Sequence, residues 1–190
     1  MLKNLPNILT LLRVAFIPAI YICLISEKHF GDLALWLGVF CYGFACLSDF
    51  FDGWLARKLD VQSGFGRMLD PIADKLMVGM VLVMLVDNGS ISGVHTIAAL
   101  IILAREILVS GLREYLIELR VGLPVSQLAK IKTTAQMVAL GFLLAGAAGE
   151  KLIAASMHIG LVLLWLAALL TIYTGYDYLR IGMRHAPWNK

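Results

Sequence analysis

Six apolar segments dominate this chain, and each is long enough, or nearly so, to cross a lipid bilayer as an α-helix. A spanning helix needs about 20 apolar residues and pairs all of its backbone polar groups internally. Apolar residues make up 60% of the chain and charged residues 15%, a balance well outside that of soluble proteins. The sequence therefore predicts an all-α integral membrane bundle of six transmembrane helices. These are expected at residues 6–26, 33–56, 67–87, 92–118, 132–149 and 155–182.

The length of 190 residues predicts a single membrane domain over residues 1–190. Residues 1–10 mix Lys3, Asn4, Pro6 and Asn7 with Leu and Ile, which predicts a short interfacial segment before the first span. No small-residue cleavage pattern follows the first apolar run, so a cleaved signal peptide is not expected. The three cysteines fit no metal-ligand spacing and are expected to pack as small apolar residues.

Basic residues lie mainly at alternate connections between the predicted helices. The opposite connections hold only Lys28 and Lys151. Because cytoplasmic loops carry the excess of Lys and Arg, both termini are predicted to be cytoplasmic. The net charge is only +3, and one basic membrane face favours anionic lipid headgroups or phosphorylated substrates over nucleic acid. The basic residues on this face are Lys3, Arg13, Arg57, Lys58, Arg67, Arg113, Arg120, Lys130, Lys132, Arg180, Arg184 and Lys190.

Four carboxylates lie at helical spacing beside the connection between the second and third predicted helices. Asp49 and Asp52 are three residues apart, and Asp70 and Asp74 are four apart, so each pair shares one helix face. The short connection makes the two helices antiparallel neighbours, which brings both acidic faces together at the cytoplasmic interface. Ionised carboxylates near hydrocarbon cost several kcal/mol unless they are compensated, so this cluster is expected to be functional.

A divalent cation is the predicted compensation for these carboxylates. Ligands that are all oxygen favour Mg²⁺ or Mn²⁺, with Ca²⁺ less suited to a cytoplasmic site. Two ions bridged by shared carboxylates would form a clamp for phosphoryl transfer. The alternative is a set of interfacial salt bridges between the four carboxylates and Arg57, Arg67 and Lys75.

Small residues accompany the acidic cluster. Gly53, Ala56 and Gly66 lie on or near the same faces, where they would let a flat group or a phosphate approach the backbone. Arg57, one turn after Gly53, could neutralise that phosphate. Close helix packing is the alternative explanation for the three small residues.

The pattern D-x-x-D-G-x-x-A-R, eight residues, then G-x-x-x-D-x-x-x-D resembles the signature of the CDP-alcohol phosphotransferase family at every fixed position. Members transfer a phosphoalcohol or phosphatidyl group from a CDP-linked donor to an acceptor hydroxyl and release CMP. The resemblance implies that Asp49, Asp52 and Asp70 hold the metals, and that Asp74 completes the site and is the candidate general base. It also implies that Gly53, Ala56, Arg57 and Gly66 line the cytidine and diphosphate pocket.

A second group of motifs, between about residues 4 and 140, resembles the branch of this family that uses glycerol 3-phosphate as acceptor and CDP-diacylglycerol as donor. These motifs are N-L-P-N-I-L-T at 4–10 with Arg13, D-P-I-A-D-K at 70–75, A-R-E-I at 104–107, L-R-E at 112–114 and K-I-K-T-T-A-Q at 130–136. The resemblance further implies a homodimer. The expected location is the bacterial inner (plasma) membrane, with the active site facing the cytoplasm.

A phosphorylated acceptor needs cations beyond the metals, and the sequence offers four. Arg105 and Arg113 are eight residues apart, close to one helix face, and Lys130 and Lys132 begin the fifth predicted span on the same side. The positive-inside bias alone could also explain Arg113 and the two lysines. Glu106 and Glu114 could orient the arginines.

Asn7 and Thr10, three residues apart, could reach the donor diphosphate from the first span, or could cap a helix. Two rival functions stay open for the chain as a whole. One is a sibling enzyme that uses inositol phosphate, phosphatidylglycerol or serine as acceptor. The other is a divalent-cation transporter, although inverted repeats, which are common in transporters, are not visible here.

Overall fold

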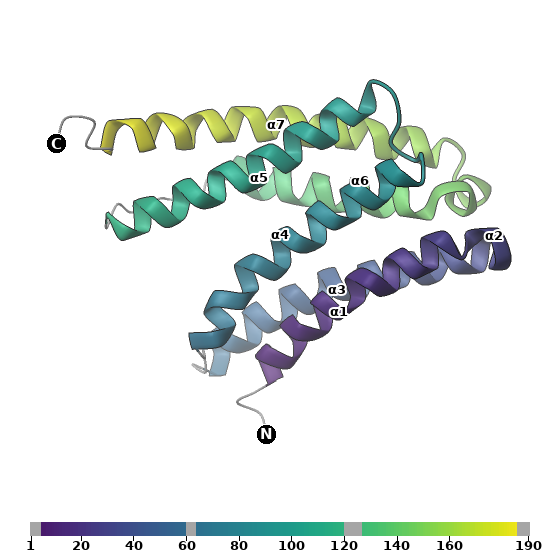
Figure 1. Cartoon of the computed structure of the whole chain (residues 1–190), viewed down its shortest axis with the longest axis horizontal. Helices are drawn as coiled ribbons and strands as arrows, with labels where there is room; N and C mark the ends of the chain where they lie inside the picture. The colour runs from purple at the N-terminus through teal and green to yellow at the C-terminus, as the bar shows by residue number, and fades with distance from the viewer. Residues whose placement is uncertain (1–4, 60–63, 120–126, 186–190) are drawn as a thin grey trace.

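The computed structural model describes residues 5–59, 64–119 and 127–185, which form seven helices and contain no strand (Figure 1). Side chains are described for residues 7–48, 66, 68–117, 119 and 127–183. The prediction of an all-α fold is confirmed. The helices are α1 (Leu5–Ile25), α2 (Glu27–Phe30), α3 (Asp32–Leu59), α4 (Gly64–Asp87), α5 (His95–Glu118), α6 (Gln127–Leu152) and α7 (Ser156–His185).

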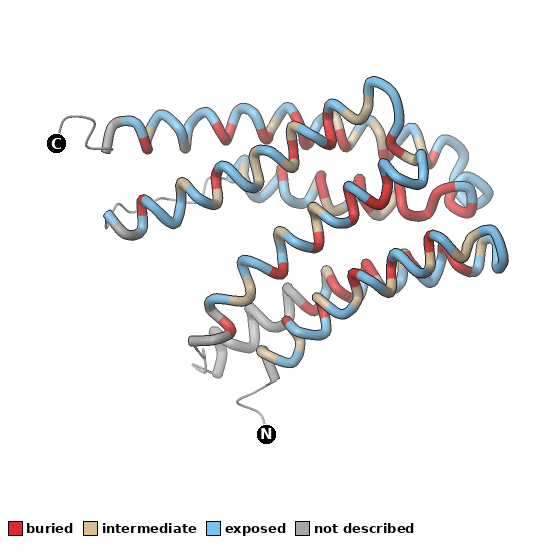
Figure 2. Tube along the Cα trace, in the orientation of Figure 1, coloured by how far each residue is buried: buried red, intermediate tan, exposed pale blue. Residues whose placement is uncertain are grey.

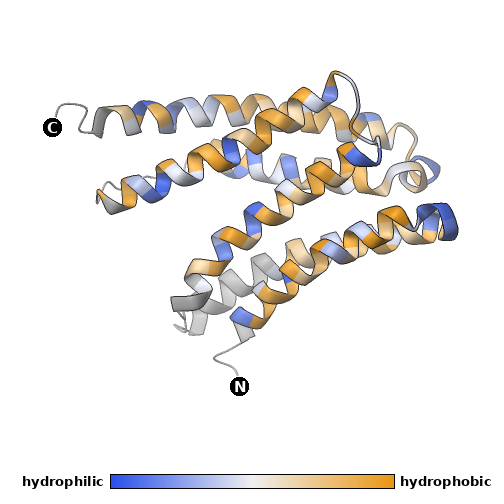
Figure 3. Ribbon diagram, in the orientation of Figure 1, coloured by the Kyte–Doolittle hydropathy of each residue, from blue (hydrophilic) through white to orange (hydrophobic). Residues whose placement is uncertain are grey.

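Within the residues that the structure describes, four helices are long and apolar enough to cross a membrane, which indicates an integral membrane protein. The qualifying segments are Asn7–Ile25, His95–Ile117, Gln127–Leu152 and Ser156–Met183. The described apolar part of α3, Asp32–Ser48, is shorter, and α4 carries Asp70, Asp74 and Lys75 in its first half. Hydrophobic residues run along most of each long helix, whereas α2 is hydrophilic (Figure 3).

The predicted helix boundaries agree with the structure to within about five residues, and the structure adds two local features. Residues 5–10, part of the stretch 1–10 expected to be interfacial, are helical and form the first turns of α1. The connection after the first span contains the short helix α2, which ends at Gly31 with φ 56°. Only glycine adopts a positive φ without steric cost, so Gly31 allows the sharp turn into α3.

The long helices pack as two groups that share one seam. Helix α1 lies against α3 and α4, while α7 lies against α5 and α6, and α3 contacts α6 between the groups. Buried residues are frequent at the end of the molecule where the helices converge near α2 (Figure 2). Ile20, Leu85, Ile102 and Leu140 are fully buried and belong to one apolar core. At the opposite end, where α4 begins, α1 and α3 diverge from α5 and α7 (Figure 1).

Glycines bring α6 and α7 close together and bend α6. Gly146 has φ 48° and ψ −132°, so α6 is two helical segments joined at a buried kink. A Cβ at Gly160 of α7 would lie 2.9 Å from Leu143 Cγ of α6, too close for any side chain. Small residues of this kind let helix backbones approach within a bilayer, where van der Waals packing contributes strongly to association.

Candidate active site

Two carboxylates of α4 are held by polar side chains of α1. Thr10 Oγ1 donates a hydrogen bond of 2.6 Å to Asp70 Oδ1, and Arg13 Nη1 forms an ion pair of 3.3 Å with Asp74 Oδ1. Both pairs are possible together because Thr10 and Arg13 are three residues apart on α1 and the two aspartates are four apart on α4. Helix α1 therefore fixes the orientation of the α4 carboxylates.

The ion pair between Arg13 and Asp74 is asymmetric in exposure. Arg13 is completely buried, while the side chain of Asp74 is 54% exposed. A buried guanidinium is stable in a membrane protein only when its charge is compensated, which Asp74 does here. One face of the Asp74 carboxylate stays open to the space beside α4.

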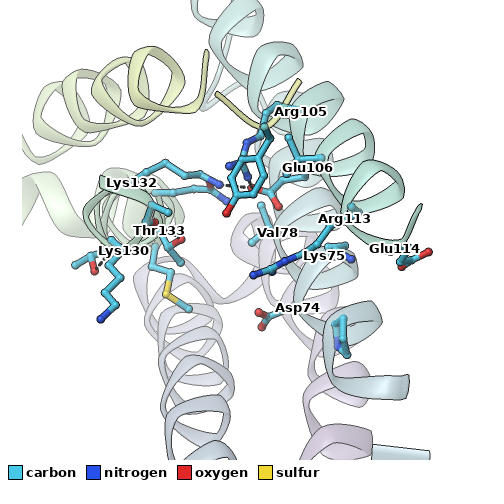
Figure 4. A pocket seen from close by; sticks show the side chains of 18 of the residues that line it. Asp74, Lys75, Val78, Arg105, Glu106, Arg113, Glu114, Lys130, Lys132 and Thr133 are labelled. Atoms are coloured by element: carbon cyan, nitrogen blue, oxygen red, sulfur yellow. Dashed lines mark hydrogen bonds and ion pairs between the residues drawn. The ribbon is translucent and has the colours of Figure 1, made fainter. Parts of the chain in front are cut away.

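That space is a cavity of about 860 Å³ between α4, α5, α6 and α7. Asp74 and all four basic residues predicted to bind the acceptor line it: Arg105, Arg113, Lys130 and Lys132 (Figure 4). With Lys75, Glu106 and Glu114, the lining holds five cations against three carboxylates. The cavity is thus basic, and it suits a small anionic ligand.

Glu106 links two of these cations. It accepts hydrogen bonds from Lys132 Nζ of α6 and from Arg105 Nη1 of α5, the latter at 3.3 Å. Figure 4 shows the three side chains converging. Lys132 is only 3% exposed, so Glu106 supplies the charge that its burial requires. The prediction that Glu106 orients an arginine agrees with this geometry.

Helix α7 supports Arg105 from the other side. Arg105 Nη2 donates to Thr174 Oγ1 at 3.2 Å, and the guanidinium carbon lies 6.0 Å from the centre of the Tyr178 ring, within cation–π range. A Cβ at Gly175 would lie 3.3 Å from Arg105 Cγ, so the glycine leaves room for the arginine stem. Arg105 is therefore held rigidly.

The other two cations predicted to bind the acceptor are less constrained. Arg113 and Lys130 are exposed, and within the described residues neither forms an ion pair. Lys130 on α6 lies across the cavity from Arg113 on α5 (Figure 4). These two cations are the ones most available to an incoming anion.

Part of the predicted site falls outside the described side chains. The backbones of Asp49, Asp52, Gly53, Ala56 and Arg57 belong to α3, but their side chains are not described. Gly66 is buried near the start of α4, and Asn7 is partly buried in the first turns of α1. Among the described side chains, no group of three or more His, Cys, Asp or Glu is placed to hold a metal ion.

Several site residues were not predicted. Arg13 was predicted as a basic residue of the cytoplasmic face and as part of a motif, but not as the partner of Asp74, although a cation inside an apolar helix, three residues after Thr10, is a signal for a buried partner. Thr174 and Tyr178 belong to no recognisable sequence motif. They contact Arg105 because α7 packs on α5. Gln136, which is 2% exposed, also lines the cavity.

Comparison with known proteins shows the family to which the chain belongs. The family described as CDP-alcohol phosphatidyltransferase matches residues 3–173, and the chain belongs to that family. A protein of Rickettsia bellii (strain RML369-C) is 48% identical over 178 residues, which cover 94% of each chain. It is named CDP-diacylglycerol–glycerol-3-phosphate 3-phosphatidyltransferase.

More distant relatives carry the same name. A protein of Cereibacter sphaeroides is 37% identical over 211 residues, covering 93% of this chain and 94% of its own. A protein of Shigella flexneri serotype 5b is 38% identical over 178 residues, covering 93% of each chain. The similarity thus extends over nearly the whole length of both partners in each comparison.

Proposed function

We propose that this protein transfers the phosphatidyl group of CDP-diacylglycerol to glycerol 3-phosphate, giving phosphatidylglycerophosphate and CMP. The observation that carries the proposal is the cavity in which Asp74 and four basic side chains from α5 and α6 meet. A carboxylate beside a basic pocket suits an acceptor that has both a hydroxyl and a phosphate. The three relatives described above, at 37–48% identity, bear the name of this activity and support the same choice of acceptor.

The proposed setting is a single domain of residues 1–190 with six membrane spans and both termini in the cytoplasm. Helices α3 and α4 would provide the two spans beyond the four long apolar helices, with their charged ends at the interface. The cavity would then face the cytoplasm of a bacterial inner membrane, where glycerol 3-phosphate is dissolved. A homodimer is part of this proposal.

The donor set fits a hard divalent cation, Mg²⁺ or Mn²⁺. Asp49, Asp52, Asp70 and Asp74 supply only carboxylate oxygens, and Asp70 is already oriented by Thr10. When bound, one or two such ions would offset negative charge on the donor diphosphate as CMP leaves. Gly53, Ala56, Arg57, Gly66, Asn7 and Thr10 are proposed to border the donor headgroup.

Asp74 is proposed to act as the general base. Its open face takes the proton of the C1 hydroxyl of glycerol 3-phosphate, and that oxygen attacks the β-phosphorus of the donor. The new phosphorus–oxygen bond forms as the bond to the bridging oxygen breaks, and CMP departs with the bonding electron pair. Arg13 holds the carboxylate in orientation during this step.

The basic residues are proposed to bind the phosphate of the acceptor. Arg113 and Lys130 are exposed and can pair with it. Arg105, Glu106 and Lys132 line the same cavity and are held in place by the hydrogen bonds between them. Binding the phosphate at a fixed distance from Asp74 would place the C1 hydroxyl for attack, which converts binding energy into orientation.

The proposal is tested by measuring CMP release from CDP-diacylglycerol with a panel of acceptors: glycerol 3-phosphate, inositol phosphate, phosphatidylglycerol and serine. Purified protein should release CMP with glycerol 3-phosphate, should stop after chelation, and should recover with Mg²⁺ or Mn²⁺. Preference for another alcohol would assign the chain to a sibling activity. Metal flux into proteoliposomes without CMP release would favour a transporter.

Two substitutions test the roles of individual residues. Asp74→Asn should abolish turnover, and near-normal CMP release would remove Asp74 as the base. Arg113→Ala should raise the KM for glycerol 3-phosphate far more than the KM for the lipid donor. An equal effect on both substrates would contradict the acceptor site.

A further inference from the structure

Gln136 is a buried polar residue of the cavity that has no role in the function proposed above. Its side chain is 2% exposed, it lines the cavity, and its amide oxygen Oε1 has no hydrogen-bond partner within the described residues. Buried polar atoms in native proteins are nearly always hydrogen-bonded, so an unpaired acceptor at a cavity wall points to a ligand that supplies the missing donor.

The position of Gln136 places it beside the proposed acceptor site. It follows Lys132 by four residues on α6, so the two side chains share one helix face and lie one turn apart. Both side chains are almost completely buried, Lys132 at 3% and Gln136 at 2% exposed. Met137, the neighbour of Gln136, is held from α3, where Tyr42 Oη donates to the Met137 carbonyl at 3.2 Å.

Among the buried side chains of the cavity, Arg105 Nε also has no hydrogen-bond partner in the described part of the chain, but it is a donor, whereas Gln136 Oε1 is an acceptor. Arg105 pairs with Glu106 and Thr174, and Lys132 pairs with Glu106. Glycerol 3-phosphate carries three polar groups. In the function proposed above, the phosphate takes the cations and the C1 hydroxyl donates to Asp74. The C2 hydroxyl is left without a partner, and Gln136 is left without a donor.

We propose that the side-chain amide of Gln136 accepts a hydrogen bond from the C2 hydroxyl of the acceptor and thereby selects glycerol 3-phosphate over alcohols that lack it. The inference rests on the proposed function and adds a specificity residue to it. Rotation about the terminal torsion of Gln136 is soft and breaks no existing hydrogen bond of Oε1, so the carbonyl turns readily toward the ligand. A carbonyl oxygen suits a hydroxyl and repels a phosphate.

The experiment compares glycerol 3-phosphate with propane-1,3-diol monophosphate, which keeps the phosphate and the primary hydroxyl but lacks the C2 hydroxyl. For the wild type we expect kcat/KM to favour glycerol 3-phosphate by about 10- to 100-fold. Gln136→Met, which conserves volume, should reduce that preference to within about threefold by lowering activity on glycerol 3-phosphate alone. Gln136→Leu should behave in the same way.

Thr133→Val is the matched control. Thr133 lines the same cavity, but its hydroxyl is committed to the Ala129 carbonyl at 3.0 Å, so this variant should keep the wild-type preference. Melting curves and size-exclusion profiles in detergent would verify folding of each variant. The wild-type ratio is itself decisive, since a ratio near one overturns the proposal without any variant.

Two further results would also overturn it. If Gln136→Met retained the wild-type preference, the amide would not form a hydrogen bond with the C2 hydroxyl. If it lost activity equally on both acceptors, Gln136 would contact the phosphate or serve only packing. Wild-type protein that released CMP only with a different alcohol would instead refute the proposed function, and the specificity role would fall with it.

Discussion

Arg13 and Asp74, sixty-one residues apart in the sequence, form an ion pair of 3.3 Å in which the arginine is completely buried and the aspartate faces a cavity. This pair joins α1 to α4 at the point where the proposed base acts. The buried Arg13 holds Asp74 in place, and the exposed side of Asp74 leaves a carboxylate oxygen available to a substrate.

Arg13 is expected to position Asp74 without touching the substrate. Arg13→Met should lower kcat at least about tenfold while changing the KM for glycerol 3-phosphate little, because the carboxylate loses its orientation. Arg13→Lys keeps the positive charge but loses the planar guanidinium group, so this variant should have an intermediate kcat. Steady-state CMP release measures both variants, and a normal kcat in Arg13→Met would exclude the positioning role.

The hydrogen bond from Thr10 to Asp70 should tune metal affinity. Groups that orient a ligating carboxylate typically contribute 10- to 100-fold to metal binding. Thr10→Val, which removes only the donor, is expected to raise the Mn²⁺ concentration needed for half-maximal CMP release by roughly tenfold. Thr10→Ser preserves the hydroxyl and serves as control. An unchanged Mn²⁺ dependence in the valine variant would mean that Asp70 is not oriented through Thr10.

Glu106 should be more important for stability than an exposed acid. Glu106→Gln leaves Lys132 buried without its charge partner, which is expected to cost about 3 kcal/mol of unfolding free energy. Adding Lys132→Met should recover much of that loss. Lys151→Met is the control, since the pair of Lys151 with Asp32 is exposed and should contribute less than about 1 kcal/mol. Denaturation in detergent compares the variants, and equal losses at the two sites would contradict this account.

Gly175 should affect acceptor binding through the stem of Arg105. In Gly175→Ala the new methyl group would lie 3.3 Å from Arg105 Cγ and push the guanidinium away from Thr174. We expect a KM for glycerol 3-phosphate several-fold higher, with kcat changed less. Gly111→Ala is the matched control, because a Cβ there meets nothing within 4 Å. Identical kinetics in the two variants would argue against the close contact.

Much of this architecture could be predicted because it depends on local patterns. Long apolar runs predicted the helices to within about five residues, and helical spacing predicted that Arg105 and Arg113 share a face. The meeting of these arginines with Lys130 and Lys132 followed from their common membrane side. Each of these predictions needed only periodicity, hydropathy or charge.

The remaining features depend on how distant helices pack. The hydrogen bond that the Thr10 hydroxyl donates to Asp70, sixty residues away, was not predicted. The kink at Gly146 has no distinctive local sequence, and the contacts of Thr174 and Tyr178 with Arg105 exist only because α7 lies against α5. Such contacts are set by tertiary packing, which single-sequence patterns do not encode.

The two groups of helices divide the proposed chemistry between them. Asp70 and Asp74 are tied to α1, whereas Arg105 and Lys132 belong to the α5–α7 group, so the separation of carboxylate and cations depends on the angle between the groups. Helices tilt to match the thickness of the surrounding hydrocarbon layer. The rate of CMP release should therefore depend on the acyl-chain length of the surrounding lipids. The thickness of the bilayer would then regulate the synthesis of the phospholipids from which the bilayer is built.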